Sequence, residues 1–317
     1  MSQTLSVLVP HTACLHGVTY IVCDAKRKGE DSSAHLETTI GADDEPVFFA
    51  LVADGHGGSA IAKMLAEALL PRIVAEARDA STAELERAMI LSFEAMHTDA
   101  RGAHPAAGST ATVVAIAQAR GTITCANVGD SLAYGFSHGR TAKDKHPMHL
   151  ATCHRLQDRH GERHTTEVEQ VLAAGGQVGK AVDERGQAGG PLRAWPGGLA
   201  VSRSLGDADC DPWISATPSV CSYPLCHEHA CDVLLATDGL WDALSLPRVY
   251  QLVERWPRLS RSAKDLVEQA IYTKGCVPSP SATSPSSAPP QPLRLPMCLP
   301  LLSLTRRPHI RLVGRML

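Results

Sequence analysis

Three apolar stretches of the chain each end at an aspartate with a glycine beside it, and this repeated pattern constrains the fold most. The stretches cover residues 48–54, 122–130 and 232–239, and the aspartates are Asp54, Asp130 and Asp238. Short apolar runs bounded by glycine predict buried strands. A glycine at the strand end accepts a positive φ and lets the backbone approach a ligand closely. The pattern therefore predicts strands that deliver carboxylates to a common site.

Carboxylates that converge on one site repel one another unless a cation neutralises them. Their hard oxygen atoms favour Mg²⁺ or Mn²⁺, and a pair of such ions can activate water and hold a phosphoryl group. His56 follows the first strand and is suited to protonate a leaving oxygen, and Glu30 and Asp31 form a fourth acidic position. These residues predict metal-assisted hydrolysis of a phosphate ester. The alternative is that each acid is an independent turn residue, because Asp-Gly pairs are common in turns.

The order of the expected elements favours antiparallel sheets over βαβ units. Strands at 108–116 and 122–128 are joined by a short turn, which is typical of a meander. Ser81 and Glu84 form a capping box, which predicts a helix start. The other expected elements are strands at 18–22, 47–53 and 232–236 and helices at 60–78, 166–173, 246–256 and 262–272. Apart from the helix at 166–173, residues 150–198 are expected to form a long surface excursion.

Five short motifs follow one another along the chain. They are Asp54–Gly58, Gly108–Ala111, Ala126–Ser131, Leu199–Asp207 and Ala236–Asp242. In order and approximate spacing they resemble the motifs of the metal-dependent protein phosphatases of type 2C, over roughly residues 18–272. Two further stretches, Lys28–Asp31 and Pro191–Gly198, are most similar to the plant and algal branch of that family.

This resemblance implies an α+β fold, a four-layer α-β-β-α sandwich of two mainly antiparallel sheets. It implies hydrolysis of phosphoserine and phosphothreonine in proteins by water that a dinuclear metal centre activates. The implied cofactors are two Mg²⁺ or Mn²⁺ ions, with a weaker third, and the implied partners are phosphorylated protein substrates. Residues 175–198 correspond to a flap that helps to select those substrates.

The resemblance also implies a role for each acidic position. The metal ligands would be Asp54, the carbonyl of Gly55, Asp238, Glu30, Asp31, Asp130 and Asp242. Of these, Asp54 would bridge the two metals, and Asp130 and Asp242 would share the weaker third site with Asp238. Glu30 and Asp31 would act partly through bound waters, and His56 would be the general acid.

The chain departs from the family pattern at two positions near the site. Lys26, followed by Arg27, stands where many members have the arginine that holds the phosphate. Lysine offers a point charge without the bidentate fork of arginine, so phosphate binding is expected to persist but to be weaker. Cys153 stands where an aspartate is common before His154, and we expect little effect.

The third departure lies at the C-terminus. Residues 1–275 form the phosphatase-like domain, and 276–317 form a Pro/Ser-rich and then basic tail that is expected to be disordered. Family domains close with an Asp-Asn pair, whose aspartate binds metal, and a final strand. This chain has no acidic residue after Glu268. The closing strand and one metal ligand are therefore expected to be missing.

Composition excludes some functions and leaves others open. The net charge of −3 gives no bulk attraction to nucleic acid. No apolar run reaches the roughly 18 residues of a membrane span. The ten cysteines, with no secretory leader at the start, indicate reduced thiols in an intracellular protein of the cytoplasm or nucleus, and we expect a monomer.

Two other readings remain open at this point. The missing ligand favours an inactive phosphatase-like protein that binds phosphoproteins or partners without turnover. A structural zinc site is the other, and its candidate ligands are Cys221, Cys226, His227, His229 and Cys231. Their spacing does not match the paired cysteines that structural zinc sites commonly use.

Overall fold

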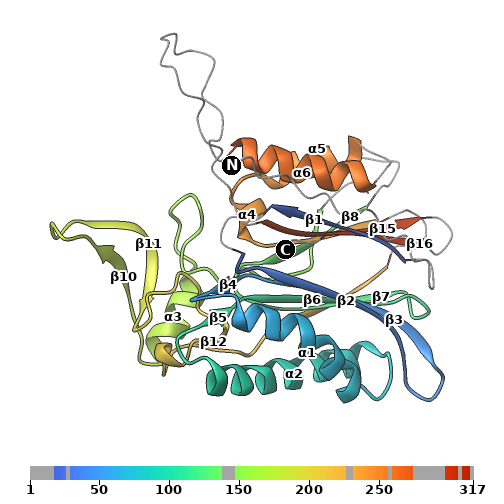
Figure 1. Ribbon diagram of the computed structural model, residues 1–317, viewed down its shortest axis with the longest axis horizontal. Helices are drawn as coiled ribbons and strands as arrows, with labels where there is room; N and C mark the ends of the chain where they lie inside the picture. The colour runs from blue at the N-terminus through green and yellow to red at the C-terminus, as the bar shows by residue number, and fades with distance from the viewer. Residues whose placement is uncertain are drawn as a thin grey trace, which may run out of the picture.

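Two β-sheets packed face to face form the centre of the molecule, and helices cover both outer faces (Figure 1). The computed structural model describes residues 18–25, 29–137, 147–225, 231–255, 259–273, 297–305 and 309–314. Helices α1 (Ala60–Glu76) and α2 (Thr82–Ala103) cover one sheet, and α5 (Leu246–Arg255) and α6 (Leu259–Thr273) cover the other. The predicted α+β sandwich of four layers is confirmed. Within the described residues, no helix combines the length and apolar character that crossing a bilayer requires.

One sheet is a fully antiparallel set of five strands in the order β13-β7-β6-β3-β2. Its strands are β2 (Ser32–Ile40), β3 (Glu45–Ala53), β6 (Ala111–Ala117), β7 (Thr122–Val128) and β13 (Ser219–Pro224). Along β3, Phe48 packs in the core between the two sheets and Phe49 in the core under α1 and α2. Because β3 is buried on both faces, its apolar run is continuous rather than alternating.

Strand β2 is an element that the sequence analysis did not predict. It forms the edge of the sheet and pairs only with β3 within the described structure. Most of its residues are partly exposed, and its sequence is correspondingly polar. An edge strand of this kind lacks the apolar run that identified β3.

The other sheet has the order β1-β16-β15-β14-β8-β9. Its strands are β1 (Val18–Ala25), β8 (Leu132–Ser137), β9 (Pro147–His149), β14 (Cys231–Ala236), β15 (Met297–Thr305) and β16 (His309–Gly314). β15 runs antiparallel to β14 and to β1. Strand β14 is buried along its whole length, so it lies in the interior of the sheet.

The prediction of a disordered tail is wrong for the two segments that form β15 and β16. Residues Met297–Thr305 lie between β14 and β1 and so supply a strand where a missing one was expected. The sequence there is apolar and includes Pro300, a residue type that is uncommon in the middle of a sheet. The segment brings no carboxylate, so the prediction that one acidic ligand is lacking is unaffected. Residues 274–296 lie outside the described residues.

Smaller elements extend from one end of the sandwich. A short sheet in the order β12-β5-β4 joins Leu205–Gly206, Gly108–Ser109 and Gly55–His56. Helix α3 (Thr165–Ala173) and the hairpin of β10 (Gln177–Val182) and β11 (Ala188–Trp195) project beyond it (Figure 1). This hairpin is the expected flap region. The turn η2 (Ala208–Cys210) and the one-turn helix α4 (Asp238–Trp241) follow β12 and β14.

The tail strands give a direct test of this topology. Deleting residues 297–317 is expected to lower the free energy of unfolding by about 2 kcal/mol or more, because β14 loses hydrogen bonds along a buried edge. Urea unfolding of the two chains measures the difference. Equal stability would mean that β15 and β16 do not belong to the sheet.

Candidate active site

Five aspartates from four separate segments lie at one edge of the sandwich. They are Asp31 before β2, Asp54 after β3, Asp130 after β7, Asp238 at the start of α4 and Asp242 at its end. Each interacts electrostatically with at least one other member of the set. Asp54 and Asp238, which lie far apart in the sequence, are among the interacting pairs. The structure thus brings together all five of the aspartates that the sequence analysis singled out.

Burial and crowding raise the pKa values of three of these carboxyl groups. Burial, the charge of Asp130 and the charge of Asp54 together raise the pKa of Asp238 to about 8. The pKa of Asp31 is raised to about 6, mainly by burial. Burial and the neighbouring Asp31 raise the pKa of Asp54 well above its usual range. Such shifts indicate a shortage of positive charge around the cluster.

The arrangement fits a bound divalent cation. Oδ1 of Asp31 is buried and has no hydrogen-bond partner among the residues described here. An orphaned carboxylate oxygen in an acidic cluster is a donor that Mg²⁺ or Mn²⁺ prefers. Glu30 lies beside this position, and its Oε1 accepts a hydrogen bond from the backbone N–H of Gly58 (3.2 Å). Glu30, Asp31 and Asp54 therefore form an inner group of oxygen donors.

Gly55 allows the chain to bend tightly between these acids. A Cβ at this position would lie 2.5 Å from the backbone oxygen of Glu30 and 3.0 Å from that of Gly58. Those distances are shorter than any ordinary contact, so only glycine fits. The carbonyl of Gly55, predicted as a ligand, accordingly lies on a segment packed closely against Glu30.

Hydrogen bonds to the Gly108–Ala111 motif fix the backbone of Asp54. The N–H of Asp54 donates to Thr110 Oγ1 (3.1 Å), and the N–H of Thr110 donates to the Asp54 carbonyl (2.9 Å). Thr110 Oγ1 also shares a hydrogen bond with Ser131 Oγ (2.7 Å), next to Asp130. Thr110 of the Gly108–Ala111 motif therefore connects the backbone of Asp54 to Ser131, the neighbour of Asp130.

His56 is held by Asp207, a residue whose role the sequence analysis missed. Nε2 of His56 lies 2.8 Å from both carboxylate oxygens of Asp207, which also accepts a hydrogen bond from Ser204. The Asp207 side chain is 3 % exposed and that of His56 is 32 % exposed. Gly108 makes room for the carboxylate, since a Cβ there would lie 2.0 Å from it. The short β12-β5-β4 sheet thus aligns His56 with its partner.

The environment of His56 favours its protonated form. Burial disfavours the charged ring, but the hydrogen bond and charge of Asp207 outweigh burial and raise the pKa of His56. The charges of Asp54 and Asp130 act in the same direction. A protonated His56 beside a hydrolytic site is suited to general-acid work.

Arg155 is the second residue that the sequence analysis missed. Its Nε donates to Asp130 (2.6 Å), and its terminal nitrogens donate to Asp242 (2.5 and 3.1 Å) and Asp238 (2.8 Å). One guanidinium therefore contacts the outer three acids of the cluster. The residue lies in the polar stretch 150–198, which was interpreted as surface, and an isolated arginine there gives no periodic signal.

A cavity of about 660 Å³ opens between the acids and the flap. Its lining includes Asp238, Asp242 and Arg155 of the cluster and Lys180 and Arg193 of the flap. The cavity therefore brings basic side chains of the flap into the same space as the acidic cluster. Such a lining suits an anionic ligand that approaches a cation-filled acidic site.

Five predicted site residues lie outside the described part of the chain. They are Lys26 and Arg27, the expected phosphate ligands, and Cys226, His227 and His229, three of the candidate zinc ligands. Cys221 lies in β13 opposite Cys125 of β7. Cys153 lies near Asp130, and burial raises the pKa of its thiol to about 11.

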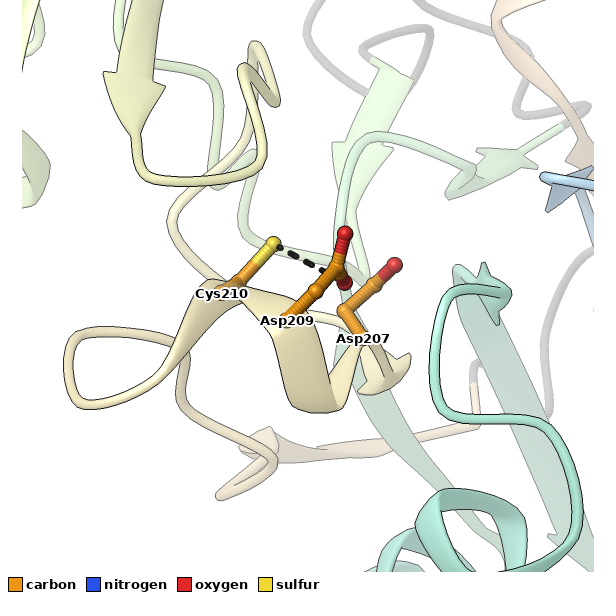
Figure 2. A group of neighbouring side chains, drawn as sticks. All are labelled: Asp207, Asp209 and Cys210. Atoms are coloured by element: carbon orange, nitrogen blue, oxygen red, sulfur yellow. Dashed lines mark hydrogen bonds between the residues drawn. The ribbon is translucent and has the colours of Figure 1, made fainter.

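A second group of possible ligands lies on the turn η2. Figure 2 shows Asp207, Asp209 and Cys210 side by side, and their ligand atoms lie within 4.8 Å of one another. The carboxylate of Asp207 already binds His56 and Ser204. Burial and the neighbouring acids raise the pKa of Cys210 to about 12, which disfavours the thiolate that a metal needs. This group is better explained as the support of His56.

The contact between His56 and Asp207 predicts a pH effect. Asp207→Asn removes the charge that raises the His56 pKa, so the ring should lose its proton at lower pH. Asparagine tolerates the left-handed backbone of position 207 (φ 53°), so the fold is expected to survive. An NMR titration of the His56 ring measures the change. Asp209→Asn, on an exposed neighbour, is the control, and equal pKa values in the Asp207 variant and wild type would contradict the contact.

Comparisons with known proteins agree with this geometry. The family model described as protein phosphatase 2C matches residues 21–276. A probable protein phosphatase 2C 33 of Oryza sativa subsp. japonica is 34% identical over 256 residues, 76% of this chain and 56% of that protein. A probable protein phosphatase 2C 15 of Arabidopsis thaliana is 34% identical over 229 residues, 71% of this chain and 49% of that protein. The chain spans about half the length of these relatives.

Solved structures show the same fold. A C. elegans sex-determining protein superposes with a TM-score of 0.65 at 24% identity, over 89% of this chain and 64% of that one. A serine-threonine phosphatase 2C from Toxoplasma gondii gives a TM-score of 0.58 at 17% identity, over 81% of this chain and 93% of that one. The family model, the plant relatives and the fold agree. The chain belongs to the protein phosphatase 2C family, in its plant-like branch.

Proposed function

We propose that this protein is a Mg²⁺- or Mn²⁺-dependent phosphatase that hydrolyses phosphoserine and phosphothreonine in proteins. The observation that carries the proposal is the convergence of five aspartates on one edge, with Asp54 and Asp238 within electrostatic reach of each other. The family match supports the same chemistry. The names of the relatives say that they are phosphatases, and their substrates are not named.

The inner donors Glu30, Asp31 and Asp54 would hold the cations, together with the carbonyl of Gly55. Asp238, which interacts with Asp54 and also contacts Arg155, would complete the set. When bound, two divalent cations would supply the acidity that activates water and the charge that neutralises the phosphoryl oxygens. Lys26 and Arg27 remain the proposed phosphate contacts.

His56 would protonate the leaving oxygen of the serine or threonine. Because Asp207 engages Nε2, the opposite ring nitrogen is left to donate the proton. Asp207 also raises the pKa of the ring, which favours its protonated form. The protein substrate would enter the cavity between the acids and the flap, where Lys180 and Arg193 favour negatively charged segments.

The lack of a carboxylate in β15 favours a second candidate function. The strand beside β14 contains no acid, so one ligand of the family pattern is missing. The protein would then bind phosphoproteins without hydrolysing them. This reading predicts retained peptide binding with no metal-dependent rate.

Hydrolysis of a phosphothreonine peptide with Mn²⁺ separates these functions. Wild type is expected to turn over the peptide, and Asp54→Asn to lose about 100-fold or more in kcat/KM, because a direct metal ligand is removed. Asp43→Asn changes an exposed acid in a turn; it is the control and should retain activity. A wild-type rate equal to that of Asp54→Asn would refute the enzyme, and peptide binding would then support the second function.

A further inference from the structure

Arg155 places a permanent positive charge within the acidic cluster. All three nitrogens of its guanidinium donate to carboxylates, and Asp242 receives two of the four hydrogen bonds. Arginine stays protonated in proteins, so the guanidinium keeps its positive charge at every pH at which the protein is folded. Forked hydrogen bonds between arginine and carboxylate are among the strongest of their kind.

The backbone around Arg155 is fixed on both sides. The N–H of His154 donates to the Gly129 carbonyl (3.0 Å), and the N–H of Gly129 donates to His154 Nδ1 (3.1 Å). On the other side, the N–H of Leu156 donates to the Ala200 carbonyl (2.9 Å). The first pair of bonds ties His154, the residue before Arg155, to Gly129, the residue before Asp130. The side chain therefore starts from a rigid base that is aimed at the outer acids.

The cluster is divided between an inner and an outer half. In the inner half, Oδ1 of Asp31 has no hydrogen-bond partner within the described residues. In the outer half, Asp130 and Asp242 each bind the guanidinium, and Asp238 contacts it while also interacting with Asp54. One oxygen atom of Asp31 is thus open to a cation in the inner half, whereas Arg155 occupies the acids of the outer half.

We propose that Arg155 closes the outer half of the cluster to a divalent cation, so that this protein holds its ions only in the inner half. The inference rests on the proposed metal-dependent function. A cation entering between Asp130 and Asp242 must displace the guanidinium and its four hydrogen bonds. The expected third and weaker ion would consequently be absent while Arg155 is seated.

Equilibrium dialysis of the full chain against Mn²⁺ tests this without relying on activity. Wild type is expected to bind two ions, and Arg155→Met, which keeps the bulk and removes the charge, to bind one more. Adding Asp130→Asn to Arg155→Met should abolish the extra ion, which locates it. Arg72→Met removes an exposed ion pair with Asp99 on α1 and α2 and should leave binding unchanged.

The outcomes distinguish this inference from the proposed function. Equal binding by wild type and Arg155→Met, or three ions on wild type, would overturn the role of Arg155 and leave the phosphatase intact. No binding by either chain would overturn both. If Arg155→Met does not fold, Arg155→Lys serves instead, because one ammonium cannot span three carboxylates. It should take up the extra ion more weakly, and unchanged binding would refute the inference.

Discussion

Mutual repulsion among crowded, partly buried carboxylates is the constraint on which this structure depends. The sandwich brings Asp31, Asp54, Asp130, Asp238 and Asp242 together from segments that are remote in sequence. Water cannot screen these charges well at a partly buried edge, so positive charge must come from elsewhere. Arg155 supplies part of it, and divalent ions would supply more.

The supports around the acids are as specific as the acids themselves. Thr110 clamps the backbone of Asp54, and Gly55 allows the closest approach of two segments. Asp207 sets the orientation and charge of His56. These contacts explain the glycine and the small hydroxyl residues near Asp54 and Asp207. They hold the catalytic groups in the geometry that the reaction requires.

The parts of the fold that could be predicted are those that leave a local signal. β3 is buried on both faces and therefore reads as a continuous apolar run, whereas the edge strand β2 is polar and was missed. β15 was missed because Pro300 interrupts its apolar run, a Pro/Ser-rich stretch precedes it, and its pairing with β14 exists only in the fold.

The site residues, too, separate into those with a local sequence signal and those without one. Each aspartate at a strand end was identified from its own neighbours in sequence. Asp207 was not assigned to His56, because 151 residues separate them and their contact exists only in the fold. Arg155 was missed because a single arginine in a polar stretch looks like any solvated residue. Long-range electrostatic partners therefore remain the part that a sequence alone does not identify.

Proton release on Mn²⁺ binding at pH 7 tests the central claim most directly. Asp238 has a pKa of about 8, so its carboxyl holds a proton at pH 7 without metal, and the pKa of Asp54 is raised as well. A cation that binds Asp238 must displace that proton. Calorimetric titrations in buffers of different ionisation enthalpy should show release at pH 7 that diminishes as the pH rises above 8. Binding without proton release, or no binding, would contradict the account.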